Sequence, residues 1–269
     1  MSLVNQNLNV GIIGVGVMGE ALLSALISSG QSPSRISIYE KREDRALEIT
    51  SRFKVNNSNS NVIAANCDVI LLVTKPQDLG ALLDAIGHKI KPGTLLVSFV
   101  AGKKISFISD KAPSAKVIRV MPNTPILVGK GASALSMGQG VSEELKNYVL
   151  NFLQSAGKVI VVDESLQDAV TATSGSGPAY FFAFVEEMVN GAISLGLTEE
   201  DAKTLTIQTL VGAAEMLEKS GKSATTLREN VTSPNGTTAA ALTKFKEKEF
   251  GKLIAEAMRA ARDRSQELA

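Results

Sequence analysis

The feature that most constrains the fold is a glycine-rich turn near the N-terminus, Gly14-Val15-Gly16-Val17-Met18-Gly19. It follows an apolar stretch typical of a buried strand, and apolar residues at helical spacing come directly after it. In such a unit the first glycine permits the tight turn, the second lets the backbone approach a pyrophosphate, and the third lets helix and strand pack closely. The pattern therefore predicts dinucleotide binding at Gly14–Gly19.

The first half of the chain alternates apolar strands with helical stretches, which predicts βαβ units and a parallel, doubly wound sheet of the Rossmann type. The expected strands are Leu8–Gly14, Arg35–Tyr39, Asp68–Thr74, Thr94–Phe99, Ala115–Met121, Ala132–Ser136 and Lys158–Val162. The expected helices are Met18–Ser29, Arg42–Phe53, Pro76–Ile90 and Ser142–Ser155, and the Asn/Ser cluster Asn56–Asn61 indicates a loop.

After Asp163 the strand-like patterns stop, and the rest of the chain is expected to be all-α. The expected helices are Leu166–Ser174, Pro178–Leu195, Glu199–Lys219, Leu227–Val231, Thr237–Lys248 and Phe250–Leu268. Gly196 and Gly221 follow helix ends, where a left-handed cap is expected. Two domains are predicted: residues 1–163, which bind the dinucleotide, and residues 164–269, which are helical. The expected helix Pro178–Leu195 is apolar on more than one face. In so small a domain such a helix usually packs against another subunit as well, so a partner subunit is expected.

Two further segments of the first half are candidates for coenzyme contacts. Glu40 ends the second strand, where an acidic residue usually holds the ribose hydroxyls of NAD, whereas Lys41 and Arg42 would accommodate the extra phosphate of NADP. The sequence leaves this choice open, because Lys41 and Arg42 equally suit a solvated helix start. Thr74-Lys75-Pro76 closes the strand that starts at Asp68, at the carboxyl edge where open α/β folds bind ligands.

A hydroxyl-rich stretch in the second half, Val231–Leu242, joins a Pro-Asn-Gly turn to an alanine-rich helical run (VTSPNGTTAAAL). Free N–H groups at a helix start form an anion site. The Ser and Thr side chains there either bind a small acid or cap the helix. Taken alone, the stretch leaves both interpretations open.

Composition excludes several classes of function. The net charge is +1, from 28 basic and 27 acidic residues without a long run of either sign, which argues against nucleic acid or an anionic membrane as partner. One Cys and one His are too few for a typical zinc site, and the single Cys67 cannot form an internal disulfide. No apolar run reaches the ~18 residues of a membrane span, and no signal-peptide layout is present. A reduced, metal-free, cytoplasmic protein is expected.

Five separated motifs resemble those of the pyrroline-5-carboxylate reductase family in order and spacing. They are IGVGVMG, VTKPQ, VIRVMPNTP with GKGASAL, TSGSGPAYFF and VTSPNGTTAAAL. The resemblance implies a Rossmann domain followed by a helical domain that interleaves with its twofold mate, in dimers that often build decamers. It also implies reduction of (S)-1-pyrroline-5-carboxylate to proline with NADPH or NADH, and here we expect NADPH, with NADH as the alternative.

The resemblance also assigns residues by position. Gly16–Met18 would lie at the pyrophosphate, Thr74–Pro76 would line the coenzyme cleft, and Met121, Asn123 and the segment Ser174-Gly175-Ser176-Gly177 would border the nicotinamide and substrate. The substrate carboxylate would be received by Ser233, Gly236, Thr237 and Thr238, and Thr238, also near the ring nitrogen, is the candidate catalytic residue. Two departures from the family pattern stand out. Asn235 replaces the first glycine of the usual SPGG turn, and the run Asn59-Ser60-Asn61 leaves the position of a coenzyme-binding Asn ambiguous.

The chemistry of imine reduction agrees with this residue set. Hydride must reach the carbon of a protonated imine, and because solvent can protonate a cyclic imine first, no strong side-chain acid is required. The only His, His88, is expected to have a surface or packing role. What the reaction needs is a carboxylate anchor and a fixed distance between two flat rings. The Gly-Ser-Gly-Pro turn ending at Pro178 either permits that approach or simply starts a helix tightly.

Three rival functions fit this sequence less well. A β-hydroxyacid dehydrogenase would carry a catalytic lysine where this chain has Phe181. A deazaflavin-linked NADP oxidoreductase resembles only the first half. A non-catalytic dinucleotide-binding regulator has no reason to retain both the GSGP and the SPNGTT turns. Coenzyme preference, oligomer size, substrate breadth and feedback by proline are not determined by the sequence.

Overall fold

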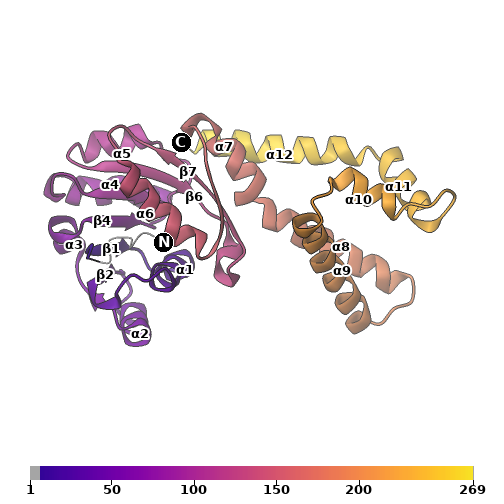
Figure 1. Ribbon diagram of the computed structural model, residues 1–269, viewed down its shortest axis with the longest axis horizontal. Coiled ribbons are helices and arrows are strands. Elements are labelled where there is room, and N and C mark those ends of the chain that lie inside the picture. The colour runs from indigo at the N-terminus through magenta and orange to yellow at the C-terminus, as the bar shows by residue number, and fades with distance from the viewer. Residues whose placement is uncertain (1–6, 269) are drawn as a thin grey trace. The chain divides into compact units, whose positions relative to one another are not determined.

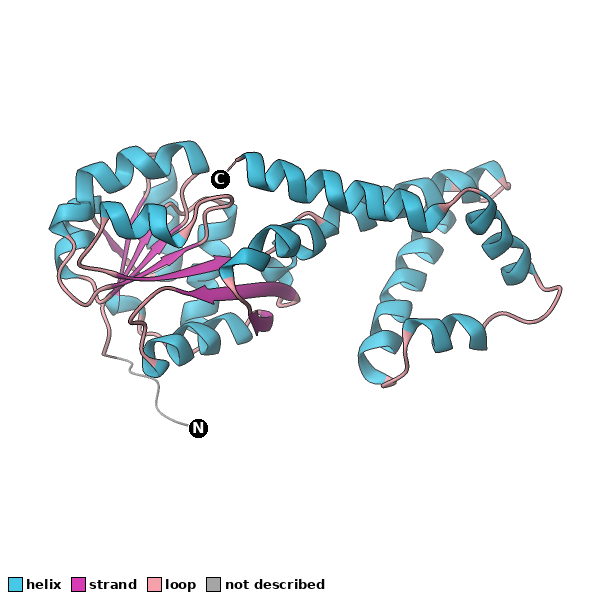
Figure 2. Cartoon of the chain, turned by 90° about the horizontal axis from the view of Figure 1, so that it is seen from above, coloured by secondary structure: helices cyan, strands magenta, loops and turns pink. Residues whose placement is uncertain are grey.

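The computed structural model describes residues 7–268, and the chain forms two compact units. The first unit comprises Met1–Ser176 together with the C-terminal segment Ala261–Ala269, and the second comprises Gly177–Ala260. The beginning of the N-terminal segment, where we expect no signal-peptide layout, lies outside the described residues. All strands belong to the first unit and the second contains only helices, as Figure 2 shows.

The first unit is built on an eight-stranded sheet with the order β3-β2-β1-β4-β5-β6-β7-β8 (Figure 1). The strands are β1 (Val10–Ile13), β2 (Ile36–Tyr39), β3 (Asn56–Asn57), β4 (Val69–Leu72), β5 (Leu95–Ser98), β6 (Lys116–Met121), β7 (Gly131–Met137) and β8 (Gly157–Val161). The order reverses between β1 and β4, which is the topological switch point of a doubly wound sheet. The predicted Rossmann-type fold and the all-α character of the second half are confirmed.

Two separate hydrophobic clusters fill the two faces of this sheet, because alternate side chains of each strand point to opposite sides. On β4, Val69 and Leu71 join one cluster and Ile70 and Leu72 the other. The first cluster is completed by α1 (Val17–Ser28), α2 (Glu43–Phe53) and α6 (Glu143–Gln154). The second is completed by α3 (Ser60–Asn66), α4 (Pro76–Ile86) and α5 (Ile105–Lys111). The sheet is therefore buried on both sides, and its ligand-binding edge is the carboxyl end of the parallel strands.

Three features of the first unit differ from the expectation. Strand β7 runs antiparallel to β6, because the connection 122–130 contains only a 3-10 turn (Thr124–Val128) and no crossover helix. The Asn/Ser cluster is not a loop throughout, since Asn56–Asn57 forms edge strand β3 beside β2 and Ser60 begins α3. Helix α5 was not expected at all. Asn59 caps α3 by accepting a hydrogen bond from the Val62 N–H at 3.0 Å, so part of the polar cluster is a helix-start signal.

Helices α8 (Gly177–Ser194), α9 (Glu199–Lys219), α10 (Ala224–Asn230) and α11 (Thr237–Glu247) lie in the second unit, and α12 (Phe250–Glu267) begins there. The predicted glycine caps are confirmed, with φ of 103° at Gly196 and 67° at Gly221. The expected helix Leu166–Ser174 is instead a short helix, α7 (Gln167–Val170), that widens into a π-helical turn, Thr171–Gly175.

The second unit has almost no core of its own. Among its described residues only Gly177, Val189, Ala202 and Thr206 are buried, whereas large apolar side chains such as Phe182 (66% exposed) and Leu205 (57%) face outward. None of the helices in residues 7–268 has the length and apolar character required to cross a membrane. So large an exposed apolar surface is typical of a surface that a partner covers.

Candidate active site

A cleft of about 640 Å³ opens at the carboxyl edge of the sheet, where β1, β2 and β4 end. Its lining includes Ser60 and Asp78 as well as the predicted coenzyme residues Gly14, Gly16, Glu40, Lys41, Arg42, Thr74 and Lys75. These residues lie close together because the carboxyl ends of the parallel strands meet at the switch point. Of the ambiguous run Asn59-Ser60-Asn61, only Ser60 lines the cleft, since Asn59 caps α3 and Asn61 accepts a hydrogen bond from Lys89.

The glycine turn is held by contacts to β2 and α2. The Gly14 N–H donates to the Tyr39 carbonyl at 2.8 Å, and the Val15 N–H donates to the Glu40 carboxylate at 3.0 Å. On the other side of the same residue, Arg45 Nε donates to the Val15 carbonyl at 3.2 Å. Both polar groups of the Val15 backbone are thus fixed, which orients the start of α1 before any ligand arrives.

Arg45 is a residue that sequence reasoning missed. It lies one helical turn after Arg42 on α2, and it pairs with Glu48 and Glu20 as well as with the Val15 carbonyl. The hydrogen bond to Glu48, helped by Glu20, raises the pKa of the Arg45 guanidinium above its usual value, although partial burial lowers it. The signal in the sequence is the position of Arg45 three residues after Arg42, because a long side chain on the helix after β2 can reach back to the glycine turn.

The cleft fits a dinucleotide. Gly16 is the N-cap of α1 without a side-chain hydrogen bond, so the first N–H groups of the helix remain free for an anion. No heavy atom lies within 4 Å of the position that a Cβ on Gly16 would take, which leaves open space against the backbone. Thr74 Oγ1 is buried and has no hydrogen-bond partner in the described part of the chain, as expected of a group that serves a ligand.

The remaining residues predicted to bind the coenzyme have packing roles or lie outside the cleft lining. Val15 is fully buried, and a Cβ on Gly19 would overlap the Gly14 carbonyl oxygen, so Gly19 allows α1 to approach β1. Val17 and Met18 form the first turn of α1, and Pro76 is the first residue of α4.

Met121 and Asn123, at the end of β6, contact the segment Ser174–Ser176 and do not line the cleft. Asn123 donates from Nδ2 to the Ser174 carbonyl at 3.0 Å and accepts from the Ala132 N–H at 2.8 Å. A Cβ on Gly175 would lie 2.5 Å from Met121 Cε. The structure therefore joins two of the predicted motifs, those around Asn123 and Ser174.

The hydroxyl-rich turn lies in the second unit. Asn235 adopts the left-handed region at φ 59°, as expected for the residue that replaces a glycine there. Gly236 is the N-cap of α11, and within residues 7–268 no side chain forms a capping hydrogen bond to this helix start. The Ser233, Thr237 and Thr238 hydroxyls therefore do not act as its caps in this structure.

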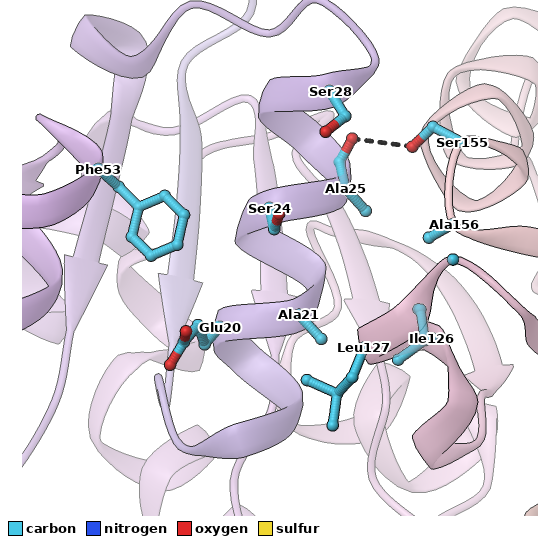
Figure 3. Close-up of a pocket in the computed structure, with 11 residues that line it drawn as sticks. Glu20, Ala21, Ser24, Ala25, Ser28, Phe53, Ile126, Leu127, Ser155 and Ala156 are labelled. Atoms are coloured by element: carbon cyan, nitrogen blue, oxygen red, sulfur yellow. Dashed lines mark hydrogen bonds between the residues drawn. The ribbon is translucent and has the colours of Figure 1, made fainter.

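A second hollow, of about 250 Å³, lies along α1 (Figure 3). Small residues of that helix line it, together with Phe53, Leu127 and Ser155. Two of its polar side chains are already paired, because Ser155 donates to the Ala25 carbonyl at 3.0 Å and Glu20 pairs with Arg45 and Arg52. It contains none of the predicted site residues, so the larger cleft is the candidate site.

Comparisons with known proteins agree with the geometry. A family model for pyrroline-5-carboxylate reductase dimerisation matches residues 164–268, and one for coenzyme F420-dependent NADP oxidoreductase matches residues 9–102 only. The chain is 38% identical to a pyrroline-5-carboxylate reductase of Corynebacterium melassecola over 264 residues, covering 96% of this chain and 98% of the relative. It is 36% identical to that of Arabidopsis thaliana, covering 98% and 96%.

The chain belongs to the pyrroline-5-carboxylate reductase family.

Solved structures of the family support the same conclusion. A pyrroline-5-carboxylate reductase from Coxiella burnetii superimposes with a TM-score of 0.91 at 32% identity, covering 97% of this chain and 98% of that one. The Plasmodium falciparum pyrroline carboxylate reductase with NADP bound gives 0.88 at 30% identity, covering 98% of each chain. The match to the F420-dependent family stops at residue 102, so that rival shares only the first part of the coenzyme unit with this chain.

The two glycines of the turn separate coenzyme binding from folding. Gly16→Ala fills space that is open in the protein, so we expect the free energy of unfolding to change by less than about 1 kcal/mol. The same methyl group would meet a bound pyrophosphate and weaken coenzyme binding by about tenfold or more. Gly19→Ala, by contrast, should destabilise the fold by about 1–3 kcal/mol. Urea unfolding and coenzyme fluorescence titration measure both effects. Unchanged coenzyme affinity in Gly16→Ala would place the pyrophosphate elsewhere.

Proposed function

We propose that this protein reduces (S)-1-pyrroline-5-carboxylate to L-proline with a nicotinamide coenzyme. The observation that carries the proposal is the pairing of two features in one chain. One is a dinucleotide cleft with a preformed glycine turn, and the other is an uncapped helix start whose hydroxyls are free of other partners. A coenzyme cleft alone suits many oxidoreductases, but the second feature selects a small acidic substrate.

The start of α11 supplies what a carboxylate needs. The helix has eleven residues, and its first N–H groups have no intrahelical acceptors. The turn before it is closed by the Gly236 N–H, which donates to the Ser233 carbonyl at 3.1 Å. A Cβ on Gly236 would collide with Ser233 Oγ, so the absence of a side chain keeps that hydroxyl close to the helix axis. We assign Ser233, Gly236, Thr237 and Thr238 to the substrate carboxylate.

The reduction itself requires little acid–base chemistry from the protein. The bound coenzyme supplies the hydride. The imine nitrogen takes its proton from solvent, and Thr238, partly buried one residue inside the helix, is placed by this proposal beside that nitrogen. We also assign the segment Ser174–Gly177 to the substrate, as the family resemblance implies. The chain's contribution is to hold the carboxylate and the ring at a fixed distance, which is catalysis by positioning.

The decisive measurement is NADPH oxidation that depends on pyrroline-5-carboxylate and yields proline. We expect turnover with this imine and none with a β-hydroxyacid, because Phe181 stands where those dehydrogenases carry their lysine. Thr238→Ala should lower kcat, and Ser233→Ala should raise the KM for the imine by about tenfold, the effect of one charge-assisted hydrogen bond.

Thr243→Ala is the matched control, because Thr243 lies on the same helix and its hydroxyl only returns to the Ala239 carbonyl at 2.9 Å. Unchanged kinetics in both site variants would remove the carboxylate site. A wild-type protein that binds NADPH but never turns over the imine would instead favour a dinucleotide-binding regulator.

We propose NADPH as the preferred coenzyme and NADH as the alternative. Lys41 and Arg42 line the cleft and can meet a 2′-phosphate, and the solved Plasmodium falciparum relative has NADP bound. Glu40 opposes that phosphate, yet its carboxylate already accepts hydrogen bonds from the Val15 N–H and, at 3.2 Å, from the Arg42 N–H. Lys41 lies 3.6 Å from Asp78 and is largely exposed, so it can turn to a ligand at little cost.

Substituting the two cations tests this assignment with an internal control. In Lys41→Ala/Arg42→Ala we expect the KM for NADPH to rise by about tenfold and the KM for NADH to stay within about twofold, because only NADPH carries the extra phosphate. Steady-state kinetics with both coenzymes on the same preparation measure this. An equal rise for both coenzymes would show that the cations act on a part that the two share.

We also propose that residues 1–163 act as the coenzyme domain and residues 164–269 as the substrate and dimerisation domain, in a cytoplasmic enzyme. The match of the dimerisation model to residues 164–268 supports this division and points to self-association. An interleaved helical dimer would cover the apolar side chains of α8 and α9, and decamers of such dimers are the larger assembly that we expect.

Light scattering should give at least twice the chain mass of 28.3 kDa. Leu205→Glu should shift the protein toward monomer, since a partner subunit that covers Leu205 would bury the new charge. Leu47→Glu is the control, because Leu47 is almost equally exposed (59% against 57%) but lies on α2 of the coenzyme unit. A monomeric wild type would contradict the interleaved dimer, and identical behaviour of the two variants would exclude α9 from the interface.

A further inference from the structure

We propose that Asn123 is a positioning residue for the imine reduction, which holds the π-helical turn Thr171–Gly175 and Ser176 in place and does not bind the coenzyme directly. This inference rests on the proposed function, and it replaces the coenzyme-binding role that the family resemblance implies for Asn123. Every contact that carries it lies within the first unit.

The turn that Asn123 holds is an unusual piece of backbone. After Val170 the helix widens, so that the Ser176 N–H donates to the Thr171 carbonyl, five residues back, at 2.8 Å. Such π-turns are rare and occur frequently at functional sites. The Ser174 carbonyl has no N–H donor four residues later, because residue 178 is Pro178. It receives a donor from outside the helix instead, through the Asn123 side chain.

The hydroxyls of the turn are divided between two uses. Thr171, Thr173 and Ser174 each donate to the carbonyl four residues earlier, Ser174 Oγ to the Val170 carbonyl at 3.2 Å. In the part of the chain that the structure describes, Ser176 Oγ has no such partner. Of the two serines in the segment Ser174–Gly177, Ser176 is therefore the one whose hydroxyl does not return to the helix, and its place depends on the turn before it.

Asn123 connects this turn to the sheet with both ends of its amide. Nδ2 donates to the Ser174 carbonyl at 3.0 Å, and Oδ1 accepts from the Ala132 N–H, at the start of β7, at 2.8 Å. Asn123 is 8% exposed, and without its side chain the Ser174 carbonyl and the Ala132 N–H would both lose the partner that they have here. One donor and one acceptor on the same short side chain are required, and among residues of this size only Asn offers both without a charge.

A second contact from the same strand acts on the next residue of the turn. Met121 lies two positions before Asn123, and its Cε occupies the space beside Gly175, where a Cβ would come within 2.5 Å. The end of β6 thus contacts Ser174 through a hydrogen bond and Gly175 through packing. Since β6 is parallel to β4 in the same sheet, with β5 between them, these contacts set the turn relative to the edge that holds the cleft.

Loss of the Asn123 amide should affect the rate of the reaction and not the binding of the coenzyme. Among the described residues its amide bonds only to Ser174 and Ala132, and it does not line the coenzyme cleft, so loosening it should leave coenzyme binding intact. It should instead let Ser174–Ser176 shift relative to the reacting rings, and a displacement of about 1 Å can cost about 10²-fold in rate.

The test compares Asn123→Leu with a matched variant, Gln31→Met. Gln31 is also a buried bridging amide, whose Nε2 donates to the Leu8 carbonyl at 3.0 Å and whose Oε1 accepts from the Tyr148 hydroxyl at 3.0 Å. Both substitutions replace the amide by an apolar group of similar length and remove one donor and one acceptor. A second variant, Asn123→Asp, keeps the acceptor for the Ala132 N–H and removes only the donor to Ser174, which protects the test if Asn123→Leu does not fold.

In both Asn123 variants we expect kcat to fall by about 10²-fold and the coenzyme Kd to stay within about twofold. Hydrogen exchange at the Ser176 amide should accelerate in these variants and not in Gln31→Met, whose thermal stability falls similarly while its kcat stays within about twofold. A coenzyme Kd that rises while kcat at saturation is unchanged would make Asn123 a direct coenzyme ligand and overturn the proposal. Equal losses of kcat in the Gln31 and Asn123 variants would reduce its role to stability and also overturn it.

The exchange measurement needs no turnover, so it separates this inference from the proposed function. A wild type without imine turnover would refute the proposed function. Faster exchange at Ser176 in the Asn123 variants would still support the tie between β6 and the turn, and unchanged exchange would refute the tie whatever the activity.

Discussion

The backbone of Val15 is held from both sides, and the coenzyme cleft depends on that constraint. Its N–H is bound by the carboxylate of Glu40, at the end of β2, and its carbonyl by the guanidinium of Arg45, on α2. A turn made largely of glycine loses much entropy on ordering, so it stays open to a ligand only if its neighbours fix it. Because β2 and α2 supply both contacts, the first βαβ unit must fold as a whole before the cleft exists.

The second unit has the opposite design. Its helices bury almost nothing within one chain, and their apolar side chains face outward. Hydrophobic burial, the main favourable term in folding, is therefore small within this unit, in agreement with the self-association to which the dimerisation family model points. In the same unit, the one turn proposed to meet substrate carries Asn235 in a left-handed conformation and an uncapped helix start. The exposed apolar side chains and the proposed substrate turn of this unit are thus both groups that a single chain leaves without partners.

Individual elements show how far local patterns reach. Continuous apolar runs identified β1, β4 and β5, because a strand buried on both faces must be apolar throughout. The pair Asn56–Asn57 could not be recognised as a strand, since a two-residue edge strand has no room for periodicity and its ladder bonds come from β2. The prediction that β7 is parallel to its neighbours was wrong, because a hydrophobic pattern does not indicate the direction of a strand. The short connection 122–130 makes β7 antiparallel to β6. The π-turn was expected as ordinary helix, since its widening depends on contacts from distant residues.

The sequence by itself determined the two-part architecture, the glycine turn, the family and the group of residues at the carboxyl edge of the sheet. These properties follow from short-range periodicity and from residue types that only a few backbone conformations admit. Only the tertiary structure decided how those residues divide their work. It showed that Arg45 braces the glycine turn, that no side chain caps α11, and that Asn123 bridges β7 and the Ser174 carbonyl. The physical reason is that a hydrogen bond between residues 51 positions apart is specified by the packing of the sheet and not by anything local to either residue.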